Sequence, residues 1–84
     1  MLPYHDIAPE LREFSEKISE FELKWHRDLE DRLVEAIGET DWQVQLEDEL
    51  PKSLNTPTLI KAGTWHRIIK GTGKLVVKII KKYE

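Results

Sequence analysis

Residues 9–37 read PELREFSEKISEFELKWHRDLEDRLVEAI, and this stretch decides the fold that the sequence predicts. Pro9 is tolerated in a first helical turn, and Gly38 follows at the position that glycine favours after a helix. Between them, apolar side chains recur at steps of three or four residues, the spacing of one buried stripe on a helix. These side chains are Leu11, Phe14, Ile18, Phe21, Trp25, Leu29, Leu33 and Ile37. The pattern predicts one long amphipathic N-terminal helix.

After Gly38 the apolar period shortens to two residues. Trp42, Val44 and Leu46 alternate with polar residues, as in a strand with one buried face. Farther on, residues 65–70 and 74–82 flank a short glycine-containing linker, 71–73, which predicts a hairpin. Residues 74–83 also fit a helical stripe, but their density of Val and Ile favours a strand. The sequence therefore predicts an α+β fold, with the long helix packed on a small antiparallel sheet of three to four strands.

Composition points to one small domain with a divided charge. The 84 residues carry a net charge of −3, but residues 1–50 hold 15 acidic and 5 basic side chains, whereas residues 51–84 hold 1 and 8. We therefore distinguish an acidic helical part, 1–38, from a basic β-rich part, 39–84. Without cysteine, disulfides and thiolate metal sites are excluded. No apolar run is long enough to span a membrane and the N-terminus lacks the features of a signal peptide, so we expect a cytoplasmic protein.

Motifs with chemical function are weak in this sequence. His5, His26 and His66 lack the spacing of metal ligands. Glu22 and Glu30 stand four residues on either side of His26, but carboxylates beside an imidazole on a solvated helical face usually only pair charges. No Ser, Thr or Lys stands beside an obvious base, and the Gly-Thr-Gly-Lys at 71–74 fits a turn better than a phosphate-binding loop. We therefore expect no metal, no cofactor, no catalytic residue and no enzymatic activity.

Aromatic and basic residues allow two interpretations. Trp25, Trp42 and Trp65 fall one in each expected element, which favours a shared core. In the alternative, Trp65 is exposed and stacks on nucleic-acid bases, with Tyr83 as a second stacking residue and lysines on phosphates. The candidate anion-binding residues are then Trp65, Arg67, Lys70, Lys74, Lys78 and Lys82.

The function favoured at this point is a small non-catalytic protein-interaction module that acts through oligomerisation or partner binding. A helix of about 28 residues spans about 42 Å, longer than the ~30 Å expected for the whole domain. We therefore expect a homodimer whose second chain covers Leu29, Leu33 and Ile37. The alternatives are a nucleic-acid-binding protein that uses the basic C-terminal hairpin, and an inhibitor whose acidic helix occupies a nucleic-acid-binding partner.

Overall fold

The helix predicted for residues 9–37 does not form. The computed structural model describes residues 2–82, and within them the chain forms eight β-strands, one short 3-10 turn and no α-helix. The fold is therefore all-β, and the α+β prediction is wrong. The elements are β1 (His5–Ala8), β2 (Leu11–Phe14), η1 (Glu20–Glu22), β3 (Asp31–Ala36), β4 (Gln43–Leu46), β5 (Lys52–Ser53), β6 (Thr58–Ile60), β7 (His66–Ile69) and β8 (Leu75–Lys82).

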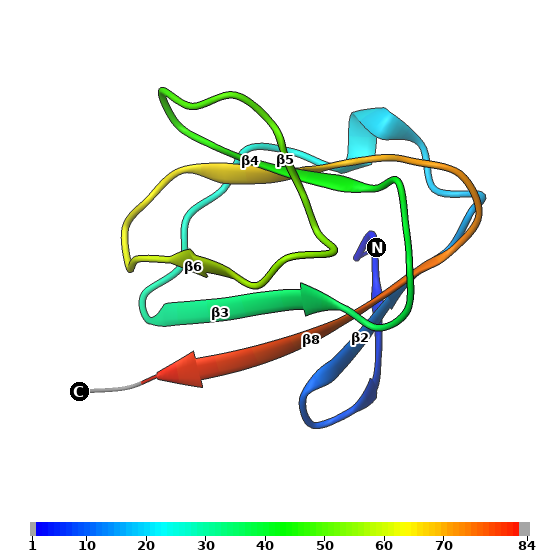
Figure 1. Cartoon of the computed structure of the whole chain (residues 1–84), viewed down its shortest axis with the longest axis horizontal. Helices are drawn as coiled ribbons and strands as arrows, with labels where there is room; N and C mark the ends of the chain where they lie inside the picture. The colour runs from blue at the N-terminus through cyan, green and yellow to red at the C-terminus, as the bar shows by residue number, and fades with distance from the viewer. Residues whose placement is uncertain (1, 83–84) are drawn as a thin grey trace.

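The strands form two antiparallel sheets. The larger sheet has the order β1-β2-β8-β3-β6, and the smaller has the order β5-β4-β7. Figure 1 shows β2, β3 and β8 on one side of the molecule and β4 and β5 on the other. Because consecutive strands often lie in different sheets, the chain crosses between the layers several times. The core therefore depends on contacts between residues that are far apart in sequence.

The core lies between the two sheets. Trp42, Val44 and Leu46 are 0%, 0% and 7% exposed, which confirms the alternation predicted for this strand. Phe14 and Val77 approach from the larger sheet. The remaining buried apolar residues belong to the same cluster: Leu23, Val34, Leu54, Ile60, Leu75 and Ile79.

The apolar stripe fails as a helix because strand pairing buries a different set of side chains. Of the eight stripe residues, Phe14 alone is buried, whereas Phe21 is 90% and Leu29 is 98% exposed. Residues 31–36 instead pair with β8 along their whole length and with β6 on their other edge. Helical structure is limited to η1, where Ser19 and Glu22 form a capping box around one turn. Packing between sheets outweighs the local helical pattern.

The predicted dimer surface loses its basis with the helix. Leu33 lies on β3, opposite Leu59 of β6 and Ile80 of β8. Leu29 precedes β3 and Ile37 follows it, so the three residues do not form one helical stripe. The acidic helix of the inhibitor hypothesis is likewise absent from the described residues. Within 2–82 no helix is long and apolar enough to cross a membrane.

The segment 66–82 is β-structured, as predicted, but it is not a hairpin. β7 pairs with β4, whereas β8 pairs with β2 and β3, so residues 70–74 cross from one sheet to the other. Gly71 lies against the start of β4, where an added Cβ would fall 2.6 Å from the backbone nitrogen of Trp42. Asp41 accepts a 2.7 Å hydrogen bond from the backbone N–H of Thr72. Glycine is needed at this crossing because the backbone approaches another segment closely.

Candidate metal centre

Two histidines forty positions apart in the sequence meet at one place in the fold. The segment before β3 runs antiparallel to β7, and His26 and His66 form a β-bridge between them. Their backbones exchange two hydrogen bonds, of 2.9 Å and 2.8 Å. Their rings lie on the same side of the bridge, with centroids 4.3 Å apart. The bridge therefore fixes the two imidazoles as neighbours.

Each imidazole is oriented by a backbone carbonyl. The Nδ1 atom of His26 lies 2.9 Å from the carbonyl oxygen of Lys24, and that of His66 lies 2.8 Å from the carbonyl oxygen of Thr64. A carbonyl can only accept, so Nδ1 carries the proton in both rings. In the neutral form each Nε2 then has a free lone pair. A hydrogen bond of this kind fixes the tautomer of histidines that bind metals.

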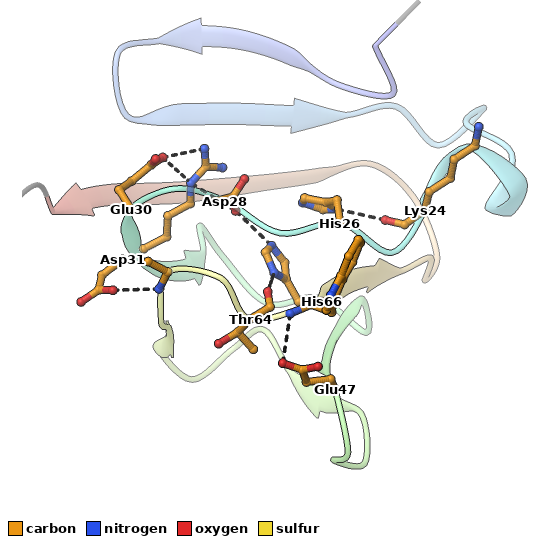
Figure 2. Close-up of polar contacts among 11 residues, drawn as sticks. Lys24, His26, Asp28, Glu30, Asp31, Glu47, Thr64 and His66 are labelled. Carbon is orange, nitrogen blue, oxygen red and sulfur yellow. Dashed lines mark hydrogen bonds and ion pairs between the residues drawn. The ribbon is translucent and has the colours of Figure 1, made fainter.

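Asp28 completes the cluster from the same segment as His26. Alternate residues of an extended chain point to the same side, so Asp28 lies beside the ring that precedes it by two positions. Its Oδ2 atom lies 3.2 Å from Nε2 of His66. Figure 2 shows Asp28 and His66 pointing toward one another, with His26 nearby on the same segment as Asp28. The side chain of Asp28 is 15% exposed and that of His66 is 5% exposed.

The Oδ2 atom of Asp28 is buried without a hydrogen-bond donor among the described residues. Arg32 is the nearest cation, with Nε 3.4 Å from Oδ2, but it donates its hydrogen bond to Glu30 at 2.9 Å. Glu30 also lies 2.8 Å from Nη2 of Arg32. The closest contacts of Arg32 are thus made to Glu30, and its ion pair with Asp28 is longer and is not a hydrogen bond.

Burial favours the neutral form of His66. Removal of the ring from water lowers the pKa of His66 below its usual value near 6.5, and this effect outweighs the opposing effects of the Thr64 carbonyl and the Asp28 carboxylate. A neutral His66 presents the Nε2 lone pair, and not a proton, to the Asp28 carboxylate. Two acceptors at 3.2 Å repel each other unless a proton or a cation lies between them. The geometry is therefore suited to a bound cation.

The cluster borders a cavity of about 290 Å³ between the sheets. Most of its wall is apolar and comes from the core, including Phe14, Leu54 and Val77. Its polar wall includes the three cluster residues together with Arg12 and Arg32. Folded domains contain few voids larger than a water molecule, so a cavity of this size beside three potential ligands is the main candidate for a binding site.

The donor set fits a first-row transition metal. One ligand atom from each of His26, Asp28 and His66 can be chosen so that all three lie within 4.8 Å of one another. Ligands at about 2.0–2.2 Å from one metal are separated by about 3–4 Å, so a small inward movement closes the site. Two imidazoles and one carboxylate leave coordination positions open, as in catalytic zinc sites and non-haem iron sites. A metal held in this way can polarise a ligand or activate a water molecule.

The candidate anion-binding residues are divided between elements of the two sheets. Lys78 and Lys82 lie on β8, opposite Glu35 and Asp31 of β3 in the larger sheet. The Nζ atom of Lys74 lies 3.8 Å from Oε2 of Glu13. The remaining members lie in β7 or directly beside it: Trp65, Arg67 and Lys70. Lys70 donates a hydrogen bond to the carbonyl oxygen of Ile18, and Tyr83 lies outside the described residues.

The structure instead brings Trp65 and Arg67 together with Trp25 and Arg27. These four residues flank the histidine bridge, two on each segment, and therefore point away from the cluster. The guanidinium of Arg67 lies 4.8 Å from the Trp25 ring, and that of Arg27 lies 5.1 Å from the Trp65 ring. Trp25 and Trp65 are 41% and 42% exposed, so only Trp42 of the three tryptophans belongs to the core.

Comparison with known proteins gives no further guide. No family model matches the chain, and no curated protein or solved structure is found to be similar to it. The site must therefore be judged on its geometry. The carboxylates that the sequence placed near His26 have other roles, because Glu22 caps η1 and Glu30 binds Arg32. Sequence reasoning missed Asp28 as a partner of His26, although their spacing of two is the signal expected of an extended segment.

Proposed function

We propose that this domain binds one divalent transition-metal ion through His26, Asp28 and His66, and that the ion serves as the anchor for a small molecule in the adjacent cavity. The observation that carries the proposal is the 3.2 Å approach of Nε2 of His66 to Oδ2 of Asp28, a buried oxygen without a donor. A divalent cation replaces the repulsion between these acceptors with two coordinate bonds.

The neighbouring contacts favour metal binding over a simple histidine–aspartate ion pair. An ion pair needs a protonated His66, and burial opposes that form by lowering its pKa. Both rings already use Nδ1 for a carbonyl, so Nε2 is the atom left for coordination. Imidazole and carboxylate together suit Fe²⁺, Mn²⁺, Co²⁺ and Zn²⁺, and the three protein ligands leave room for an exogenous one.

The test is a calorimetric titration of metal-free protein with Co²⁺ and Zn²⁺. We expect one equivalent to bind, and His26→Ala and Asp28→Asn each to weaken the affinity by at least about tenfold. His5→Ala is the matched control, because His5 is exposed on β1 and does not belong to the cluster. His26 is also exposed, so its replacement should leave the fold intact. Equal affinity in the wild type and both cluster variants would overturn the proposal.

A second candidate function rests on the outer side of the histidine bridge. Two indoles, each with a guanidinium 4.8–5.1 Å from its ring, form a surface of planar groups: Trp25, Arg27, Trp65 and Arg67. Arg67 donates its nearest hydrogen bonds to the neutral amide of Gln45, so it keeps its positive charge for an anion. Stacking on aromatic rings combined with cationic side chains is how many proteins bind single-stranded nucleic acid.

Fluorescence anisotropy with a labelled oligothymidylate tests this second candidate. We expect binding at about 50 mM salt that weakens steeply by about 200 mM, and loss of binding in Trp25→Ala with Arg27→Ala. Lys78→Met is the control, because Lys78 lies on β8 in the other sheet. Binding that survives the double substitution, or that Lys78→Met weakens as strongly, would rule out this surface.

A further inference from the structure

We propose that the ligand of the cavity is a small carboxylic acid with an apolar body, bound with its carboxylate on the metal and its body among the core side chains. The inference rests on the proposed metal site and adds the chemical class of the molecule that completes it. It follows from the charge of the centre, the composition of the cavity wall and the position of a second buried cation.

The net charge of the metal-loaded site favours an anionic ligand. A divalent ion with one carboxylate and two neutral imidazoles retains a net charge of +1. Glu30 is already held by Arg32, with atoms 2.8 Å apart, so it is not free to compensate that charge. Uncompensated charge in a partly buried site is costly, and a monoanionic ligand removes it. Carboxylate oxygens suit the same metals as the protein ligands do.

The wall of the cavity favours a ligand with an apolar body. Its apolar lining includes Leu23 and Ile79, each 9% exposed, and the partly buried Ile68, which keep some accessible surface for a ligand. Polar residues line the cavity as well, and they include the cluster, the two arginines, Lys24 and Glu22. An apolar wall stabilises a hydrocarbon portion through the removal of its surface from water. Inorganic phosphate, which has only polar atoms, would leave this wall without a partner.

Arg12 supplies the second cation. Its side chain on β2 is 12% exposed, and it lines the same cavity. The Nε atom donates a 2.8 Å hydrogen bond to Asp6, and the guanidinium lies 3.6 Å from the centre of the Tyr4 ring. Within residues 2–82 its terminal nitrogens donate no hydrogen bond, so these donors remain for an anion. Two contacts therefore hold the guanidinium in place while part of it stays available.

A ligand-binding titration on the metal-loaded protein tests the inference. Co²⁺-loaded protein is titrated with acetate, butyrate and hexanoate, and binding is followed by calorimetry and by the Co²⁺ absorption spectrum. We expect affinity to rise about fourfold for each methylene group that enters the cavity. The spectrum should change as the carboxylate enters the coordination sphere. Hexylamine and inorganic phosphate are the matched probes, one with the chain but no anion and the other with the anion but no chain.

Two substitutions locate the ligand. Arg12→Met keeps the length of the stem and removes the charge, and it should weaken hexanoate by at least about tenfold while Co²⁺ affinity is unchanged. Ile68→Phe adds volume to the cavity wall and should weaken hexanoate more than acetate. Lys52→Met is the control, because Lys52 is exposed on β5 and does not line the cavity. Circular dichroism confirms that each variant is folded.

The outcomes separate the two proposals. Failure of the protein to bind Co²⁺ overturns the metal site, and the inference falls with it. If Co²⁺ binds but hexanoate is no tighter than acetate, or hexylamine or phosphate binds as well as hexanoate, the carboxylic-acid inference is wrong while the metal site stands. Affinity that rises with chain length and is lost in Arg12→Met supports both.

Discussion

The Nε2 atom of His66 lies 3.2 Å from Oδ2 of Asp28, and neither atom carries a hydrogen when the ring is neutral. This contact is unfavourable in the metal-free protein, so Asp28→Asn should affect folding and metal binding in opposite directions. The new amide can donate a hydrogen bond to Nε2, and Arg32 loses its 3.4 Å ion pair with residue 28 but keeps its closer contact with Glu30. We expect the metal-free variant to be more stable to urea by about 1 kcal/mol.

The same variant should lose most of the stabilisation that metal gives. A ligand present at about 100 times its dissociation constant raises the free energy of unfolding by about 2.7 kcal/mol. Wild-type protein should show this rise with Zn²⁺, and Asp28→Asn should not. If metal-free Asp28→Asn is instead less stable than the wild type by more than about 1 kcal/mol, Asp28 serves the fold rather than a cation.

Trp25 and Trp65 should report metal binding, because each is adjacent in sequence to one of the bridged histidines. Co²⁺ quenches nearby indoles, whereas Zn²⁺ has a filled d shell and should not. We expect Co²⁺ to lower tryptophan emission in proportion to site occupancy, and Trp25→Phe with Trp65→Phe to remove most of this change. Trp42 remains in the double variant as a reference. An undiminished quench in that variant would place the bound ion away from the bridge.

The sequence predicted the strands with a period of two and missed the site because of one misassigned segment. In a helix, residues separated by two positions point in different directions, so His26 and Asp28 could not have acted together. In the extended chain they lie on one side. Asp28 and Arg32 do form an ion pair, with 3.4 Å between the atoms, although their spacing of four residues is equally that of a helical pair. The correct periodicity would have made the His-x-Asp spacing visible.

Other features of the fold could not be predicted from local sequence patterns. His66 approaches His26 only because β7 pairs with the segment before β3, and no local signal specifies that pairing. The 71–73 linker was correctly placed between two β segments, yet its strands belong to different sheets. Trp42 was correctly assigned to the core, whereas Trp25 and Trp65 flank inward-pointing histidines and therefore point outward.

Gly71 should tolerate substitution less well than Gly63. A Cβ at Gly71 would lie 2.6 Å and 2.7 Å from backbone and ring atoms of Trp42, and it would also collide with the Asp41 carboxylate. Gly71→Ala should cost about 3 kcal/mol in urea unfolding, the upper end for overpacking. Gly63 has a positive φ of 80° but open space around it, so Gly63→Ala should cost only about 1 kcal/mol of backbone strain. Equal costs for the two substitutions would show that residues 70–74 can move to make room for the added Cβ.

Asp41 should make the crossing between the sheets sensitive to acid. Hydrogen bonds from the backbone N–H and the hydroxyl of Thr72, at 2.7 Å and 2.8 Å, lower the pKa of Asp41 below its usual value of 3.8. A group whose pKa is lower in the folded state contributes stability above its unfolded pKa, and this contribution is lost as the pH falls through the folded value. Wild-type protein should therefore lose stability below about pH 4 through this group.

Asp41→Asn removes the titrating group and isolates this effect. The variant should be less stable than the wild type at pH 6, and the difference should shrink progressively between about pH 4 and pH 2. Thermal unfolding at several pH values measures the difference, with Asp48→Asn as the matched control. Asp48 is exposed in a turn with a φ of 60°, which asparagine adopts readily, so its replacement should give a small difference. A difference for Asp41→Asn that stays constant from pH 6 to pH 2 would mean that the charge of Asp41 does not stabilise the crossing.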